Sequence, residues 1–132
     1  MTMRVQIDRT IKTPEVRFRN GKVTIYGRSI LEDSCAFYTQ LVDLLNEYTR
    51  QGGVISQIDL CFEYLNCSST RSLVRLLKMI EERCGHDKEI CINWHYFHDD
   101  DSMLETGDVM RNISGLPINM IEVTDETFQF SS

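Results

Sequence analysis

The sequence lacks a long apolar run. No uncharged stretch approaches the roughly 20 residues that a membrane-spanning helix needs. The opening segment, MTMRVQIDRT, carries charge where a secretory signal has its apolar core. There are no internal repeats, and no stretch is rich enough in proline, glycine or serine to form a linker. We therefore expect one domain over residues 1–132, located in the cytoplasm and without a membrane partner.

Positive charge is scarce as well. The 14 Lys and Arg residues are outnumbered by 20 Asp and Glu residues, so the formal net charge is −6. Proteins that bind nucleic acid grip its backbone with clustered Lys and Arg. This balance argues against a nucleic-acid partner and favours protein partners. The count of 5 cysteines is odd, and three of them lie in apolar-patterned segments, which fits a reducing compartment.

Sequence signatures of catalysis are also missing. The chain contains no P-loop, GxSxG, GxGxxG or CxxC pattern. A cysteine-dependent phosphatase needs C-x5-R, but Leu73 stands where the arginine would follow Cys67. The residues thus carry none of these signatures of catalysis, and we expect no cofactor.

The run HYFHDDD suggests a metal site, because imidazoles and carboxylates are common metal ligands. A metal ion needs converging ligands, however, and on a strand His95 and His98 point to opposite faces. We therefore expect no metal here. Asp99, Asp100 and Asp101 are interpreted as a solvated acidic loop that can also help a partner's basic groups to dock.

Apolar periodicity predicts five strands and three helices in the order β-β-α-β-α-β-α-β. Alternating residues on both sides of Asn20-Gly21 indicate a hairpin over 15–27, since this pair supplies the positive φ of a tight primed turn. The other predicted elements are helices at about 34–51 and 68–84, strands at 55–64 and 89–97, a third helix with Asp101 or Ser102 as its N-cap, weakened by Gly107, and an edge strand at 117–123.

This alternation predicts an α/β fold with a mixed sheet of four to five strands, about three helices packed on it, right-handed crossovers and the hairpin at one end. Tyr64 is expected on the same strand face as Phe62. The predicted core consists of Leu41, Ile58, Leu60, Phe62, Leu73, Leu77, Ile90 and Ile92.

The segment EYLNCSST, residues 63–70, joins the strand at 55–64 to the second helix. Ligands of open α/β sheets lie at such joints, where a helix N-terminus presents free N–H groups to anions. Three interpretations follow from its residues. Asn66 or Ser68 caps the helix; a phosphorylated hydroxyl adds up to about two negative charges at the positive helix end; or Cys67 is a reactive thiol, because a helix N-terminus favours the thiolate.

Six motifs then occur in one order along the chain: TPEVRF (13–18), GRS (27–29), ED-S-x-x-FY (32–38), EYLNCSS (63–69), WHY (94–96) and DDDSMLETGD (99–108). Together they resemble the SiaC family of bacterial regulatory phosphoproteins. The resemblance covers about residues 13–123 and leaves a polar tail at 124–132. It implies a fold similar to STAS domains and anti-anti-sigma factors, and it implies no catalysis.

The resemblance also implies three partners. A kinase phosphorylates a hydroxyl at the joint, a PP2C-type phosphatase removes the phosphate, and the dephosphorylated protein binds and activates a diguanylate cyclase that makes cyclic di-GMP. The residues expected to contact partners are Asn66, Thr70, Arg71, Glu32, Asp33, Asp99, Asp100 and Asp101. Two alternatives stay open: a thiol-based redox sensor that uses Cys67, and an anti-anti-sigma-like regulator of transcription.

The joint departs from the family pattern at the acceptor itself. Family members read NTSS, with the threonine as phosphoacceptor, and Cys67 stands in its place. Either Ser68, with Ser69 behind it, has taken the role, or this chain stays unphosphorylated. The second outcome is favoured, because a shift by one residue turns a side chain by about 100° on a helix. The family's PENS also appears as LEDS (31–34), which changes the entry to the first helix and adds a charge.

Overall fold

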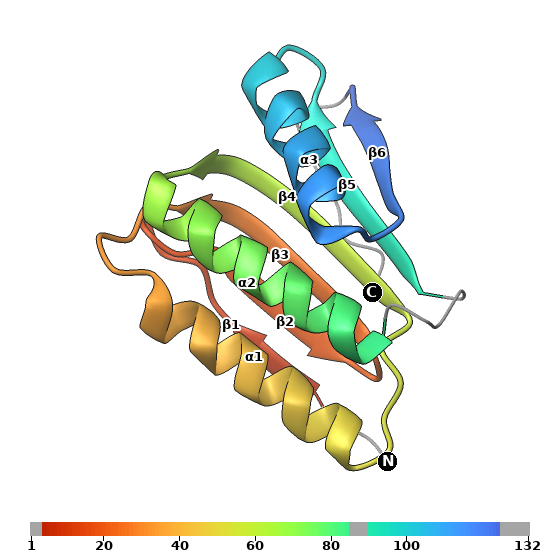
Figure 1. Ribbon diagram of the computed structural model, residues 1–132. Coiled ribbons are helices and arrows are strands. Elements are labelled where there is room, and N and C mark those ends of the chain that lie inside the picture. Colours follow the sequence, from red (N-terminus) through yellow and green to blue (C-terminus); the bar gives the residue numbers. More distant parts are fainter. Residues whose placement is uncertain (1–3, 85–89, 125–132) are drawn as a thin grey trace.

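The structure is a computed structural model that describes residues 4–84 and 90–124. These residues form one six-stranded sheet and three helices (Figure 1). The elements are β1 (Arg4–Ile7), β2 (Glu15–Arg19), β3 (Lys22–Ser29), α1 (Cys35–Arg50), β4 (Gln57–Leu65), α2 (Cys67–Cys84), β5 (Cys91–Phe97), α3 (Asp101–Ser114) and β6 (Ile118–Val123). No helix in the described ranges is long and apolar enough to cross a membrane. The predicted α/β class and mixed sheet are confirmed.

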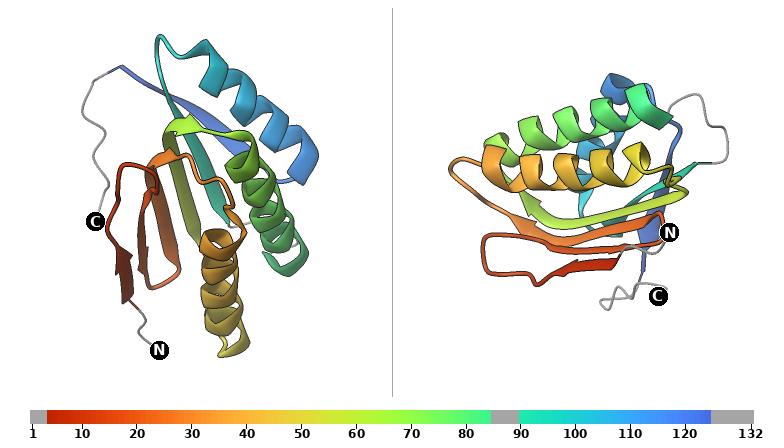
Figure 2. Two further views of the ribbon diagram at one scale, coloured as in Figure 1. Left: turned by 90° about the vertical axis from the view of Figure 1, so that its left-hand side faces the viewer. Right: turned by 90° about the horizontal axis from the view of Figure 1, so that it is seen from below.

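The strands are ordered in the sheet as they are in the chain. β1, β2 and β3 pair antiparallel, and β3, β4, β5 and β6 pair parallel. Each parallel connection passes through one helix and advances by one strand in the same direction. Because such crossovers share one hand, all three helices lie on the same face of the sheet (Figure 2). No helix of the described residues covers the opposite face, which we call the open face.

The core lies between the sheet and the helices. Each residue predicted for it is buried, with at most 6% of its surface exposed: Leu41, Ile58, Leu60, Phe62, Leu73, Leu77, Ile90 and Ile92. The rings of Phe62 and Trp94 lie at its centre, with 5.8 Å between their centroids. Burying a side chain of this size contributes about 1.5–3 kcal/mol. The predicted facing of β4 and β5 is therefore confirmed at these positions.

The hairpin between β2 and β3 turns at the predicted pair. Asn20 and Gly21 have φ angles of 49° and 84°, the left-handed values that a two-residue primed turn requires. The backbone at Val54 also lies close to Gly21, since a Cβ at position 21 would be 2.2 Å from the carbonyl oxygen of Val54. A side chain at position 21 is therefore excluded by space as well as by conformation.

Two predictions about strands were wrong. β1 was not predicted, so the sheet has six strands in the described residues where four to five were expected. Tyr64 was placed on the buried face with Phe62, but it is 55% exposed. The register shifts here, because Gly27 pairs with Phe62 and Arg28 pairs with Tyr64. The extra residue in β4 breaks the alternation and turns the Tyr64 side chain away from the core.

The third helix begins with a cap that differs from the prediction. Asp100, and neither Asp101 nor Ser102, is the N-cap, and its Oδ1 accepts a hydrogen bond from Met103 N at 3.0 Å. Asp100, with φ −104° and ψ 79°, is the last non-helical residue, and the helix begins at Asp101. α3 thus begins one residue earlier than it would with Asp101 as its cap, and two residues earlier than with Ser102.

Gly107 lies in the middle of α3, where it allows the helix to approach Trp94 closely. A Cβ on Gly107 would lie 2.4 Å from Trp94 Cδ1 and 2.5 Å from its Nε1. The indole is held in place because Nε1 donates a hydrogen bond to Met103 O at 3.0 Å. The glycine that weakens the helix in the sequence is therefore required by packing.

Candidate functional site at the joint of β4 and α2

The joint lies at the carboxyl-terminal end of the parallel strands. All three helices begin at this same end of the sheet (Figure 1). Asn66 connects β4 to α2. Its Oδ1 accepts a hydrogen bond from Ser69 N at 2.9 Å, which is the helix cap predicted from the sequence. Its Nδ2 donates to Leu31 O at 2.7 Å, and its backbone N–H donates to Ser29 O at 3.0 Å. Asn66 thus ties β3 and the loop before α1 to the start of α2.

Three serine hydroxyls meet between α1 and α2. Ser34 Oγ donates to Ser68 O at 2.7 Å, and it lies 2.9 Å from Ser68 Oγ and 2.6 Å from Ser72 Oγ. Ser34 has one hydroxyl proton, which goes to the carbonyl, so Ser68 and Ser72 both donate to Ser34 Oγ. Ser68 Oγ also accepts from Ser34 N at 3.0 Å. This cluster, which we call the serine clamp, holds the first turn of α1 against α2.

Ser69 belongs to a second, fully buried chain of hydroxyls. Tyr38 donates to Ser29 Oγ at 2.9 Å, and Ser29 donates to Ser69 Oγ at 2.6 Å. Ser29 and Ser69 are both 0% exposed. Burial raises the pKa of Tyr38 to about 12, although its hydrogen bond to Ser29 opposes the rise. An enzyme can reach the Ser69 hydroxyl only if the core opens.

Cys67 is exposed, unlike the two serines that follow it in the joint. It is the first residue of α2, and no described residue hydrogen-bonds its thiol. Ser68 behind it is half-buried, and Ser69 is buried. Thr70 turns back to the joint, where its hydroxyl donates to Asn66 O at 2.9 Å. Accessibility therefore falls along the joint, from the thiol at position 67 to the hydroxyl at position 69.

The carboxylates predicted to bind partners lie at this same end of the sheet. They are Glu32 and Asp33 before α1, and Asp99, Asp100 and Asp101 at the start of α3. Two of them hold their own helices, since Asp33 Oδ1 accepts from Cys35 N at 3.1 Å and Asp100 caps α3. All except Asp100 are exposed. Contact of any of them with a partner stays a prediction.

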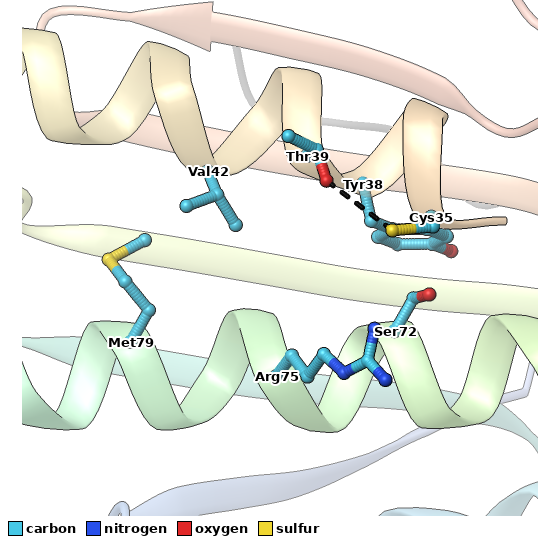
Figure 3. A pocket seen from close by; sticks show the side chains of 7 residues that line it. All are labelled: Cys35, Tyr38, Thr39, Val42, Ser72, Arg75 and Met79. Carbon is cyan, nitrogen blue, oxygen red and sulfur yellow. Dashed lines mark hydrogen bonds between the residues drawn. The ribbon is translucent and has the colours of Figure 1, made fainter.

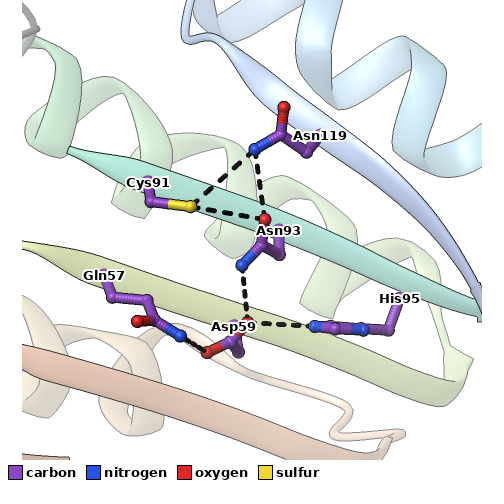
Figure 4. A network of polar contacts seen from close by, with 6 residues as sticks. All are labelled: Gln57, Asp59, Cys91, Asn93, His95 and Asn119. Carbon is purple, nitrogen blue, oxygen red and sulfur yellow. Dashed lines mark hydrogen bonds and ion pairs between the residues drawn. The ribbon is translucent and has the colours of Figure 1, made fainter. Parts of the chain in front are cut away.

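A second polar cluster, which the sequence analysis missed, lies on the open face (Figure 4). Asp59 Oδ1 is 2.9 Å from His95 Nε2 and accepts from Asn93 Nδ2 at 2.9 Å, and Asp59 Oδ2 accepts from Gln57 Nε2 at 2.6 Å. Burial by itself raises the pKa of Asp59. The hydrogen bonds from its three neighbours outweigh burial, so this pKa lies below its ordinary value. The sequence signal for this cluster is only the alternation that puts Asp59 on the polar face of its strand.

The metal site suggested by the histidines does not form in the described part of the chain. His95 contacts Asp59 on the open face, whereas His98 follows the end of β5. Among residues 4–84 and 90–124, no three His, Cys, Asp or Glu side chains are placed to hold a metal ion. The acidic run after His98 instead supplies the cap of α3.

Solved structures share this fold. SiaC of Pseudomonas aeruginosa, as found in complex with the diguanylate cyclase SiaD that it activates, has a TM-score of 0.79 to this chain. The match covers 90% of this chain and 99% of that chain at 22% identity. Apo-SiaC from the same organism matches with a TM-score of 0.73, 21% identity and coverage of 90% and 98%. The chain is therefore an α/β protein with the fold of SiaC.

Sequence comparison extends this result from fold to family. An uncharacterized protein of Pseudomonas aeruginosa strain UCBPP-PA14 is 25% identical over 124 residues, which is 92% of this chain and 98% of that protein. The model of the SiaC family regulatory phosphoproteins matches residues 7–123. The chain belongs to the SiaC family of regulatory phosphoproteins, as its motifs predicted.

Proposed function

We propose that this chain is a non-catalytic regulator that binds a diguanylate cyclase, raises its activity and thereby controls the output of cyclic di-GMP. Membership in a family of regulatory phosphoproteins supports the regulatory role. The choice of partner is supported by the shared fold with SiaC, the activator of the cyclase SiaD. The buried hydroxyls of the joint hydrogen-bond one another, which suits a clamp between helices better than a reaction site.

In this proposal the switch is held in its unphosphorylated form, and the position of Cys67 is the observation that carries it. The exposed place in the joint, where the family has its threonine, holds a thiol. A thiol is not a usual substrate of a Ser/Thr kinase. Phosphate on Ser68 has to displace the serine clamp, and phosphate on Ser69 has to enter the core. The chain therefore binds its cyclase without first needing a phosphatase.

A kinase and a PP2C-type phosphatase are the other partners of the module. Both enzymes bind at the carboxyl-terminal end of the parallel strands, where the joint and the acidic loops are located. Because Ser68 is nearer the surface than Ser69, it is the residue that takes phosphate if any switching survives.

The cyclase assignment is tested with purified proteins. The immobilised chain is incubated with lysate of the cells that produce it, and the diguanylate cyclase identified by mass spectrometry is purified. Its production of cyclic di-GMP is then measured with and without the chain. We expect the rate to rise with the concentration of the chain until it saturates. A cyclase that does not bind, or whose rate stays constant, contradicts the proposal.

The unphosphorylated state is tested by intact-protein mass spectrometry after incubation with the module's kinase and ATP. The samples are the wild type, Cys67→Thr and Ser68→Ala. We expect one phosphate on Cys67→Thr and none on the wild type. A phosphorylated wild type whose phosphate disappears in Ser68→Ala shows that the acceptor has moved. If Cys67→Thr also takes no phosphate, the kinase is not a partner.

A further inference from the structure

Three cations form a row along the exposed side of α2. Arg71, Arg75 and Lys78 are spaced by four and three residues, so they follow one another on the same side of the helix. All three are exposed, and none forms a salt bridge with a residue in the described ranges. We call this row the basic stripe. In a chain of net charge −6, an unpaired basic row is a marked local departure from the overall charge.

The backbone of α2 adds to this positive charge. α2 has no acidic residue in its first turn, so the positive end of the helix dipole is not neutralised there. The sign changes further along, because Glu81 and Glu82 follow Lys78 on exposed positions. The exposed Arg83 follows them in the last turn, so the far end of α2 carries both signs and the row of like positive charge is confined to the basic stripe near the joint.

A groove between α1 and α2 runs beside the stripe (Figure 3). It encloses about 230 Å³ and is lined by Cys35, Tyr38, Thr39, Val42, Ser72, Arg75 and Met79. Val42 and Met79 face each other at one end of it, while the Arg75 side chain extends along α2 toward Ser72. Arg75 therefore belongs to both the stripe and the groove, and it places a cation at the rim of an apolar hollow.

We propose that the basic stripe and the groove form one docking surface for an acidic, amphipathic helix of the diguanylate cyclase. This inference rests on the function proposed above. An apolar residue of that helix enters the groove between Val42 and Met79, in the way that helix anchors fill hydrophobic grooves. Its carboxylates meet Arg71 and Arg75, whose planar guanidinium groups bind carboxylates in a bidentate manner.

The stripe also explains how the joint acts on docking. Arg71 lies four residues after Cys67, so the two side chains are neighbours on the surface of α2. A negative group at position 67 lies beside Arg71, where it pairs with the guanidinium and repels an acidic partner. With a cysteine at position 67 the stripe has no such competitor and stays open to the cyclase.

The test compares two triple charge reversals that change the net charge equally. The stripe variant is Arg71→Glu, Arg75→Glu, Lys78→Glu. The control is Arg4→Glu, Arg19→Glu, Lys22→Glu, which reverses three exposed cations that are register neighbours in the sheet. Binding to the purified cyclase is measured by titration calorimetry at low and high salt. A third variant, Arg71→Ala with Arg75→Ala, removes charge without adding acids in case the reversal unfolds α2.

We expect the stripe variant to lose affinity by about a hundredfold or more and the control by about twofold at most. The affinity of the wild type should fall with salt, while the alanine variant should bind more weakly and depend less on salt. A cyclase that binds the wild type and the stripe variant equally overturns the docking surface but leaves the proposed function intact. A cyclase that does not bind the wild type overturns both.

A second copy of the chain is the other occupant that this surface could have, and it is tested separately. Sedimentation of the wild type without cyclase shows whether a second copy occupies the surface, because the acidic loops of another chain also offer carboxylates. We expect the wild type and the stripe variant to sediment alike. A dimer that the stripe variant lacks would assign the surface to a second copy and overturn the cyclase helix as its occupant.

Discussion

Asp59 and His95 face each other across β4 and β5 on the open face, with 2.9 Å between Asp59 Oδ1 and His95 Nε2. The two side chains are 15% and 13% exposed, respectively, although no described helix covers this face. Asn93 and Gln57 complete the hydrogen bonds of the carboxylate. This arrangement stabilises the ionised form of Asp59, and it therefore makes stability depend on pH.

Replacing Asp59 by Asn should destabilise the protein most above the acid range. The pKa of Asp59 is lowered in the folded state, so the contribution of the carboxylate is present above its unfolded pKa of about 3.9 and is lost as pH falls through the lower folded value. We expect Asp59→Asn to cost about 1–2 kcal/mol near pH 7, and the difference from wild type to shrink on acidification. Urea unfolding across pH measures this. Asp43→Asn, at an exposed site, is the control, and a gap that widens in acid contradicts the prediction.

Removing the Ser34 hydroxyl should loosen the serine clamp. In Ser34→Ala, the hydroxyls of Ser68 and Ser72 lose their acceptor, and the carbonyl of Ser68 loses one of its two donors. We expect a loss of about 1–3 kcal/mol in the free energy of unfolding, because buried polar groups are left without hydrogen bonds. Ser56→Ala changes an exposed serine and serves as the comparison. Equal unfolding midpoints in urea for both variants would show that the clamp contributes nothing.

Adding a methyl group to Gly107 should destabilise the protein even though alanine favours helices. The new Cβ lies 2.4 Å from Trp94 Cδ1, and Trp94 is 0% exposed. Overpacking of this kind costs about 1–3 kcal/mol, against a gain of about 1 kcal/mol in helix propensity. We expect a lower thermal midpoint and altered tryptophan fluorescence. Asn112→Ala, on the exposed side of the same helix, should show neither change; a stabilised Gly107→Ala would refute the packing argument.

A carboxylate at position 67 should separate stability from cyclase binding. Cys67→Asp places negative charge at the positive end of α2, which stabilises a helix by about 0.3–1 kcal/mol. Beside Arg71 the same charge should weaken binding of the cyclase by about tenfold. Thermal unfolding and titration calorimetry of one preparation test both signs, with the neutral Cys67→Ser as the matched control. If Cys67→Asp binds the cyclase as tightly as Cys67→Ser, position 67 does not act on docking.

Elements that depend on local pattern were predictable from the sequence. The helices predicted at about 34–51 and 68–84 are Cys35–Arg50 and Cys67–Cys84. Apolar spacing defines the buried side of each helix, and Gly52-Gly53 stops the first. Asn20-Gly21 fixes the hairpin for a similar reason, since few other pairs accept two positive φ angles.

Features that depend on how distant segments meet were not predictable. Asp59 and His95 are 36 residues apart, and Ser34 and Ser68 are 34 apart. Their contacts follow from the register of β4 with β5 and from the packing of α1 on α2, neither of which a local pattern states. The same holds for Tyr64, whose exposure comes from a shift against β3. The location of the joint was therefore predictable, but the accessibility of its thiol and hydroxyls was not.

The identical order of strands in the sheet and in the chain has a consequence for biosynthesis. Each strand leaves the ribosome after the neighbour on which it pairs, so no strand has to be inserted between two that are already joined. The β1–β3 meander is already synthesised when β4 joins it, and β5 and β6 follow in turn. The hydrogen-bond partners of Asn66 and of the serine clamp all precede β5 in the chain, so every residue that forms these contacts is synthesised before the second half of the sheet.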